Sequence, residues 1–561
     1  MSARHGSESF FIEGEGLVNT QLGGRHGDEP DPITDPDAAP PAARRAGSAP
    51  PFRFSRVGPR GRALGAPLAL ALAEAMTKGG GGRGDVPAGY TYLGQFIDHD
   101  LTMDVTDVAL GEDVTPAELL QGRSPTLDLD SLYGAGPANP DSARFYESDG
   151  IHLKTGTTIR ISPDAAKAGH DLPRVGTGGV KARRKALIPD PRNDENLIVA
   201  QTHLAMIRFH NRVATKLPAS VPAPQRFRRA RKSVTLHYQW LIRHDYLPRI
   251  VDPRVLDDVF TNGRKVVQPG AAATEMPTMP VEFSVAAYRL GHSMIRPVYD
   301  WNRRFPRGVG FLEYMFQFSA AGGDLGGADR LLSNWLADWR RMYDFPGGGH
   351  PDLAPPDGVN LAQRIDTTLT DPLKNLPPST FGGGAGIPFD DRRRNLAFRN
   401  LTRASMIRLA SGQQMVEKLR SAGVAVQPLS RRAILQGNGG AKVTGLTPQQ
   451  QDRLVADTPL WFYILREAET GDGRLRRVGA RIVAETIHRA MEGSRFSIVR
   501  EPDFRPTLGR GDDFEMTDLL FFAFAGKKAG INPSAAPERP ATRDAAPYRP
   551  GAWAYESLSR L

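Results

Sequence analysis

The sequence reads LGQFIDHD at positions 93–100, and this stretch places an amide, two carboxylates and an imidazole within an otherwise apolar segment. The apolar residues around these polar groups have a spacing typical of a buried helix. Polar side chains that are buried at such density need partners. We therefore expect a metal or a cofactor to lie against four side chains of this helix, namely Gln95, Asp98, His99 and Asp100.

The composition of the chain limits which metal ion or cofactor can lie against this helix. The chain has 561 residues, of which 40% are apolar, and it contains no cysteine. Disulfides and thiolate metal ligands are therefore excluded, and an iron or zinc ion must be held by His, Asp, Glu or main-chain oxygen. The net charge of +10 is spread along the chain, whereas a nucleic-acid-binding protein concentrates its basic residues on one face or arm. We expect no nucleic-acid partner.

No signal for export or membrane insertion is recognisable in the sequence. The first apolar run, at 63–76, is too short to span a bilayer and is interrupted by Gly65 and Pro67. We expect a cytoplasmic protein without a transmembrane segment, and secretion without a leader stays open. The oligomeric state is not predicted.

The chain is expected to form one long helical region between two arms. Composition predicts a flexible N-terminal arm at 1–51 and a Pro-rich C-terminal tail at 532–561. No repeat or linker divides residues 52–531, which we predict to be a single large, mainly α domain with long Gly/Pro-rich loops. Strand patterns are scarce, and helical periods run through segments 197–217, 227–247, 280–295, 331–343, 400–422 and 475–491.

Three further segments carry polar groups that a helical core would not contain without a reason. Arg192 and Glu195 stand just before the helix predicted to begin at residue 197. The run RLGH at 289–292 puts a glycine beside a histidine, and the missing Cβ lets a flat group approach. Asn400 and Arg403 start another predicted helix. Taken singly each segment is weak, because a pair such as Arg192 and Glu195 is usually a surface ion pair.

A haem would explain these groups together in a protein without cysteine. It needs a neutral histidine as iron ligand, a partner for the second nitrogen of that histidine, and cations for its two propionates. The residues that supply these groups would be His292, Asn400, Arg289 and Arg403. Peroxide cleavage on the opposite face needs a base and a cation, which His99 and Arg192 would provide.

The order of these motifs resembles the animal-type haem peroxidases, the peroxidase–cyclooxygenase superfamily, in its prokaryotic branch. The run GQFIDHD at 94–100 matches the distal motif of that family, and HYQW at 237–240 with HDYLP at 244–248 is a further block of the same kind. The resemblance covers scattered blocks from about Tyr92 to about Glu492. It implies a helical haem peroxidase that reduces hydrogen peroxide and oxidises a small donor, such as a halide or a phenol or another organic reductant, through a ferryl intermediate.

On the distal side, the resemblance implies that His99 is the base and Arg192 the distal arginine, with Gln95 lining a halide or water site. Asp98 and Glu195 correspond to the carboxylates that can form ester bonds to haem b.

On the proximal side, the resemblance implies that His292 binds the haem iron and that Asn400 holds its Nδ1. Arg289 and Arg403 correspond to the propionate partners. Asn196 stands where the mammalian myeloid members have a methionine bonded to the haem, which argues against strong chloride oxidation.

A calcium site is expected beside the distal helix. The loop SPTLDLD at 124–130 carries oxygen-bearing side chains at alternate positions, and calcium takes about 6 to 8 oxygen ligands. Taken alone, this loop is more often a solvated turn. In the resembling family the equivalent loop meets the aspartate beside the distal histidine. The implied Ca²⁺ ligands are Asp100, Ser124, Thr126, Asp128 and Asp130, of which the last stands where many relatives have Ser or Thr.

Three other functions remain open at this point. A fatty-acid dioxygenase of the same superfamily uses a tyrosine three residues before the proximal histidine, whereas here Arg289 holds that position and Tyr288 lies one residue earlier, about 100° away on a helix. A metal-dependent hydrolase would use His99 and Asp100 with other histidines. A basic binding protein without catalysis would use the loop around residues 392–394.

Overall fold

The computed structural model describes residues 12–13, 52, 54–103, 121–306, 308–377, 391–443 and 445–533. The arm predicted at 1–51 and the tail predicted at 532–561 therefore lie almost wholly outside the described residues. Within the described ranges, the helices are either too short or too polar to cross a bilayer.

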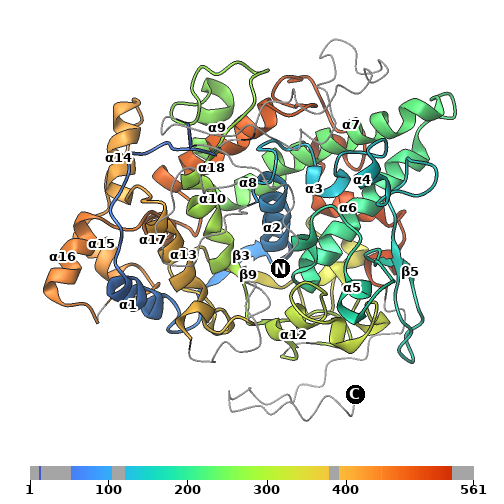
Figure 1. The fold of residues 1–561 in the computed structure, drawn as a ribbon, viewed down its shortest axis with the longest axis horizontal. Coiled ribbons are helices and arrows are strands. Elements are labelled where there is room, and N and C mark those ends of the chain that lie inside the picture. The colour runs from blue at the N-terminus through green and yellow to red at the C-terminus, as the bar shows by residue number, and fades with distance from the viewer. Residues whose placement is uncertain are drawn as a thin grey trace.

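The architecture is mainly α, as predicted. Figure 1 shows the helices arranged around α2, with α13 and α17 on one side of it and α6 on the other. The longer helices are α1 (Ala66–Met76), α2 (Gly89–Leu101), α6 (Leu197–Lys216), α7 (Ala223–Leu241), α9 (Pro253–Asn262), α13 (Leu396–Met406), α14 (Gly412–Ser421), α16 (Pro448–Ala456), α17 (Leu460–Glu469), α18 (Arg477–Glu492) and α19 (Met516–Ala523). The shorter ones are α3 (Asp130–Tyr133), α4 (Pro140–Ala143), α5 (Val180–Arg184), α8 (Leu247–Ile250), α10 (Val281–Val285), α11 (Gly291–Met294), α12 (Leu312–Gln317), α15 (Arg431–Gln436) and α20 (Lys528–Ile531).

The strands of the described chain are short. Strands β1 (Ile12–Glu13), β2 (Phe54–Ser55) and β6 (Met279–Pro280) form a parallel sheet in that order. The other pairs are antiparallel: β3 (Arg83–Pro87) with β9 (Leu361–Gln363), β4 (Gly156–Thr157) with β5 (Ala168–Asp171), and β7 (Val298–Tyr299) with β8 (Gly310–Phe311).

Three predicted helices are confirmed. The segment at 197–217 forms α6, and the segment at 475–491 forms α18. The segment at 227–247 forms α7, which continues into the single π-helical turn η2 (Ile242–Tyr246).

Two predicted helices are interrupted. The segment at 280–295 becomes α10, the 3₁₀ turn η3 (Ala287–Leu290) and α11, because Ala286 leaves the helical region and the side chain of Arg289 donates to the carbonyl of Ser284. The segment at 400–422 is divided between α13 and α14, and Arg408 lies between them with a φ of 51°.

The helix predicted at 331–343 is wrong. The chain there forms only the 3₁₀ turns η5 (Ser333–Trp335) and η6 (Trp339–Arg341). Side chains from elsewhere take its carbonyl groups: Trp301 Nε1 donates to Trp335 at 2.9 Å, and Asn302 Nδ2 donates to Leu336 at 2.7 Å. Backbone groups that have tertiary partners do not need a helix to satisfy them.

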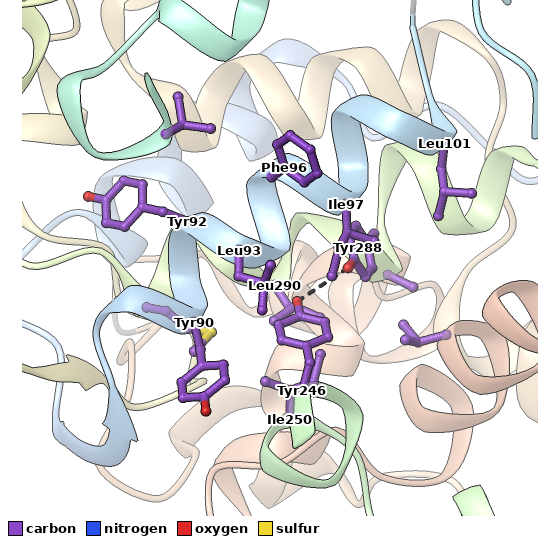
Figure 2. Packing of buried hydrophobic residues seen from close by; sticks show 14 of the residues in the cluster. Tyr90, Tyr92, Leu93, Phe96, Ile97, Leu101, Tyr246, Ile250, Tyr288 and Leu290 are labelled. Atoms are coloured by element: carbon purple, nitrogen blue, oxygen red, sulfur yellow. Dashed lines mark hydrogen bonds between the residues drawn. The ribbon is translucent and has the colours of Figure 1, made fainter. Parts of the chain in front are cut away.

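Helix α2 lies in the middle of the core and packs against α6, α11 and α3. Figure 2 shows its apolar residues Phe96, Ile97 and Leu101 among side chains from η2, η3 and α8. All three are fully buried, and burying one such side chain contributes about 1.5–3 kcal/mol to folding.

Gly94 permits one of the close contacts of α2. A Cβ at this position would lie 2.3 Å from the hydroxyl oxygen of Tyr246. The absence of a side chain at Gly94 therefore sets how closely η2 approaches α2.

Candidate active site

One face of α2 borders a space that solvent reaches. The helix is buried along its length except at Gln95 and Asp98, which are partly exposed. These residues are three positions apart, so that they lie on one face, and His99 follows directly. Gln95, Asp98 and His99 therefore face a common region, whereas Asp100 is buried on another side of the helix.

The turn η1 (Pro191–Asp194) and the start of α6 supply the partners for this face. Gln95 Nε2 donates to Glu195 Oε1 at 2.5 Å, and Asn196 Nδ2 donates to Gln95 Oε1 at 2.9 Å. Asn196 also caps α6 by accepting from the backbone N–H of Val199. The cap that starts α6 thus also fixes the amide of Gln95.

His99 is a neutral imidazole in this setting. Burial, and then the charge of Arg192, lower its pKa to about 3. Its Nδ1 lies 2.9 Å from Asn193 Oδ1, and its Nε2 lies 3.6 Å from Glu195 Oε1. Burial also raises the pKa of Glu195 to about 7, although Arg192 and Gln95 act against it.

Arg192 lies against the C-terminal end of α2. Its Nη2 donates to the carbonyl of His99 at 3.0 Å, to the carbonyl of Thr102 at 2.6 Å and to Asp190 Oδ2 at 2.7 Å. Arg123 donates to the same carboxylate oxygen of Asp190 at 2.5 Å. A fixed cation at the carbonyl end of a helix is favourable, and here it lies beside His99. Asp98, whose pKa burial raises against the effects of Arg289 and Arg192, also accepts from Thr102.

The second part of the site is built around His292, which lies on α11. Its Nδ1 lies 2.9 Å from the side-chain amide nitrogen of Asn400 on α13. A half-turn of that amide presents its oxygen at the same place, where it can accept from Nδ1–H. Burial, followed by Arg289, lowers the pKa of His292 to about 3, so that its imidazole is also neutral.

Three arginines gather beside His292. Arg399 and Arg403 are one turn apart on α13, and burial together with the charges of Arg403 and Arg289 lowers the pKa of Arg399 to about 10. Each of these guanidinium groups therefore feels the positive charge of its neighbours. Arg399 was missed in the sequence, where its spacing of four residues from Arg403 was the available signal.

These features fit a haem. Helix α11 packs against α2, which brings the segment of His292 to the segment of His99. A Cβ added at Gly291 would meet no atom within 4 Å, so there is open space beside His292. A neutral imidazole, an adjacent open space and a group of arginines are what an iron porphyrin with two propionates requires.

The loop predicted to bind calcium meets α2. The backbone N–H of Leu129 donates to Asp100 Oδ2 at 3.1 Å, and the hydroxyl of Ser131 donates to Oδ1 at 3.2 Å. Burial and the carboxylate of Asp130 raise the pKa of Asp100 to about 8.

Three of the other predicted calcium ligands form a chain of hydrogen bonds. Ser124 and Thr126 share a hydrogen bond of 2.7 Å between hydroxyl oxygens, and Thr126 donates to Asp128 Oδ2 at 2.8 Å. Within the described ranges, the side chains of His, Asp and Glu form no group of three arranged to hold a metal ion.

The site thus combines a mainly helical domain with two neutral histidines on elements that pack against each other. Comparisons with known proteins show what this chain resembles. Residues 104–332 match the model of the family described as animal haem peroxidase. The matched range contains Arg192, Glu195 and His292, begins after His99 and ends before Asn400.

Thyroid peroxidase of Rattus norvegicus is 30% identical over 195 residues, which cover 33% of this chain and 20% of that protein. The chain therefore matches about a fifth of the length of this curated relative. Peroxidase A from Dictyostelium discoideum shares the fold with a TM-score of 0.53 at 15% identity, covering 85% of this chain and 93% of that one.

A fatty acid alpha-dioxygenase from Oryza sativa shares the fold with a TM-score of 0.50 at 11% identity, covering 85% of this chain and 79% of that one. The chain is therefore similar to the animal haem peroxidases over residues 104–332, and it shares its fold with a peroxidase and with a fatty acid dioxygenase.

Proposed function

We propose that this protein is a haem peroxidase that reduces hydrogen peroxide and oxidises a small donor, such as a halide, a phenol or another organic reductant. Two neutral imidazoles carry the proposal: the buried His99 on α2 and the half-buried His292 on α11, each with an asparagine amide 2.9 Å from its Nδ1. Such an imidazole keeps a lone pair on Nε2 when Nδ1 carries the proton. Nε2 of one of these histidines can then bind a metal, while Nε2 of the other accepts a proton.

The residues of the chain that would hold haem b surround Gly291. His292 would bind the iron through Nε2, and the arginines at 289, 399 and 403 would bind the propionates. Asp98 and Glu195 are the carboxylates that would form ester bonds with it. When bound, the haem supplies the iron that exchanges electrons with peroxide.

His99 would move the proton. Its Nε2 accepts a proton from one peroxide oxygen and returns it to the other, which makes the departing oxygen a better leaving group. Arg192 supports this role in two ways, because its charge keeps His99 neutral and stabilises negative charge that develops nearby. Gln95, held by Glu195 and Asn196, lines the same space with a fixed amide.

The test is an ultraviolet–visible spectrum of haem-reconstituted protein before and after stoichiometric hydrogen peroxide. A Soret band that shifts on mixing supports the proposal, and His99→Ala should slow that shift by about 10²–10⁴-fold. His244→Ala is the matched control, because it removes an imidazole that stacks on Trp240 outside the site. Equal rates for His99→Ala and the parent protein would refute the role of His99. A protein without a Soret band would favour a metal-dependent hydrolase or a non-catalytic binding protein.

A fatty-acid dioxygenase is the second candidate, and one contact favours it. Tyr288 is buried and donates to the hydroxyl of Tyr246 at 3.3 Å, and the carboxylate of Asp98 is among the groups that raise its pKa. An oxidisable phenol therefore lies near the distal helix. Oxygen uptake with a long-chain fatty acid, abolished by Tyr288→Phe, would support this second function over the first.

We also propose that the loop at 124–130 binds Ca²⁺ together with Asp100. All five predicted ligands are buried. Ser124, Thr126 and Asp128 are joined by hydrogen bonds, and the carboxylates of Asp100 and Asp130 lie close enough to repel each other. A divalent cation would relieve that repulsion.

A further inference from the structure

A buried asparagine faces His99 from the turn before α6. Asn193 is fully buried in η1, and its backbone N–H donates to the carbonyl of Asp190 at 3.1 Å. The side chain of Asp190 caps the same turn by accepting from the N–H of Arg192 at 3.0 Å. The turn is thus fixed at its start, and it presents Asn193 Oδ1 to His99 Nδ1 at 2.9 Å.

The position of the proton on a neutral imidazole decides what the imidazole can do. A ring with its proton on Nδ1 has a lone pair on Nε2, and a ring with its proton on Nε2 is a donor there. An oxygen atom 2.9 Å from Nδ1 accepts a proton from it, so this contact selects the first form.

We propose that Asn193 is a positioning residue that holds His99 in the form with its proton on Nδ1, so that Nε2 faces the site as a proton acceptor. The structural part stands on the geometry around Asn193 alone. Its catalytic consequence rests on the proposed peroxidase function.

Other groups near His99 do not take this place. Arg192 and Arg123 are cations and cannot accept a proton, and both already bind the carboxylate of Asp190. Glu195 lies on the other side of the ring, 3.6 Å from Nε2, which is too long for a hydrogen bond. Asn193 is the group in position to decide the tautomer.

The reversed amide gives a different and testable arrangement. With Nδ2 toward the ring, Asn193 would donate to Nδ1, and the proton of His99 would sit on Nε2. That arrangement leaves the buried Oδ1 unpartnered and points the Nε2 proton at a carboxylate beyond hydrogen-bond distance. The structure has Oδ1 toward Nδ1, and Nδ2 is then without a partner among the described residues. Since each orientation leaves one atom of this amide unpartnered, the tautomer of His99 is what distinguishes them.

The first experiment measures the tautomer directly in the full chain without added haem. Ring ¹⁵N chemical shifts of histidine-labelled protein distinguish a protonated from an unprotonated nitrogen, and His99→Gln identifies the signals of His99. We expect a protonated Nδ1 and an unprotonated Nε2. A proton found on Nε2 in the parent protein would overturn the proposal.

Two substitutions separate positioning from packing. Asn193→Leu removes the acceptor with little change of volume, and we expect the proton to move to Nε2. Asn193→Asp keeps an acceptor and should keep the proton on Nδ1. Asn211→Leu is the matched control, because Asn211 accepts from the backbone N–H of Leu153 instead of from an imidazole. An unchanged tautomer in Asn193→Leu would refute the proposal, and Asn193→Val, which also lacks an acceptor, gives the same test if the leucine variant does not fold.

The second experiment uses haem-loaded protein and hydrogen peroxide. Asn193→Leu should slow the peroxide-dependent Soret change about 10- to 100-fold, the usual effect of losing a group that orients an active imidazole, and Asn193→Asp should restore most of it. The two proposals can fail separately. A normal rate in His99→Gln would refute the catalytic role of His99 and leave the tautomer result intact, whereas equal rates in the leucine and aspartate variants would refute the role of Asn193.

Discussion

His99 and His292 are alike in two respects, because burial lowers the pKa of both imidazoles to about 3 and an amide lies at each Nδ1. Their neighbours differ. Arg192 and Glu195 lie beside His99, whereas Arg289 lies near His292. A proton acceptor gains from a cation that keeps it neutral, and a metal ligand gains from cations that bind the anionic groups of the cofactor. The two residues therefore suit different tasks with the same side chain.

The first prediction for a single residue concerns His292, the proposed iron ligand. His292→Ala should lose the Soret band of a His-ligated haem, or retain haem weakly with a shifted band, because no second imidazole is held at Asn400 in the described chain. The spectrum of the reconstituted variant, with haem retention after gel filtration, measures this. An unaltered Soret band would contradict the assignment.

The second prediction concerns Glu195, whose pKa burial raises to about 7 in the folded chain from 4.5. The folded state then holds a proton that the unfolded state releases between these pH values, so this contribution to stability is full below pH 4.5 and is lost as the pH rises through 7. Replacing Glu195 by Gln should remove this decrease in the free energy of unfolding. We expect the decrease to be about 1–2 kcal/mol, after allowance for the partial exposure of Glu195. Urea unfolding at pH 4.5 and pH 8 compares the two proteins, and parallel pH profiles would contradict the shift.

At the scale of the element, strong periodicity predicted α6 and α18 well because each presents a continuous apolar face. The helix expected at 331–343 failed because Trp301 and Asn302 take its carbonyl groups, and such partners are invisible in a local pattern. The segment at 280–295 was interrupted for a similar reason, since the side chain of Arg289 donates to a backbone carbonyl.

The candidate site likewise contains residues that a local sequence pattern reveals and residues that only distant contacts make important. Residues with a family motif, such as His99 and His292, could be chosen from the sequence. Asn193 could not, because its importance comes from the residue that folding places next to it, and Arg399 had only its spacing from Arg403 as a signal.

Two glycines give a matched prediction for the helices that carry the site. Gly94→Ala should destabilise the chain by about 1–3 kcal/mol, because its methyl group would lie 2.3 Å from the hydroxyl of Tyr246. Gly291→Ala should leave the free energy of unfolding of the haem-free chain almost unchanged, because nothing lies within 4 Å of the added Cβ.

Haem titration distinguishes Gly291→Ala from Gly94→Ala. The methyl group of Gly291→Ala would enter the open space beside His292, so we expect weaker haem binding in a stably folded chain. Normal haem affinity in this variant would place the cofactor elsewhere, and an undisturbed melting temperature in Gly94→Ala would contradict the close contact with Tyr246.

At the scale of the whole molecule, the loop at 124–130 connects distant parts of the chain. Asp128 Oδ1 accepts from the backbone N–H of Arg495 at 2.7 Å, and Gln239 donates both to the carbonyl of Leu127 at 3.1 Å and to that of Phe496 at 2.8 Å. Anything that stabilises this loop therefore stabilises α2, α7 and the region after α18 together.

Calcium should act on stability through this loop. At a free concentration 100 times the Kd, a ligand that binds only the folded state adds about 2.7 kcal/mol. We expect a higher melting temperature with Ca²⁺ than with a chelator, a smaller effect with Mg²⁺, and no calcium response in Asp100→Asn. Equal melting temperatures in Ca²⁺ and chelator would count against the site.

The separation of α2, α11 and α13 along the chain bears on biosynthesis. A ribosome makes the distal half first, and the amide that orients His292 comes from Asn400, late in the sequence. A nascent chain thus exposes both imidazoles before the geometry between them exists. Binding of the proposed haem would therefore belong to the end of translation or later, and chains that stop before α13 would leave the imidazole of His292 without the amide of Asn400.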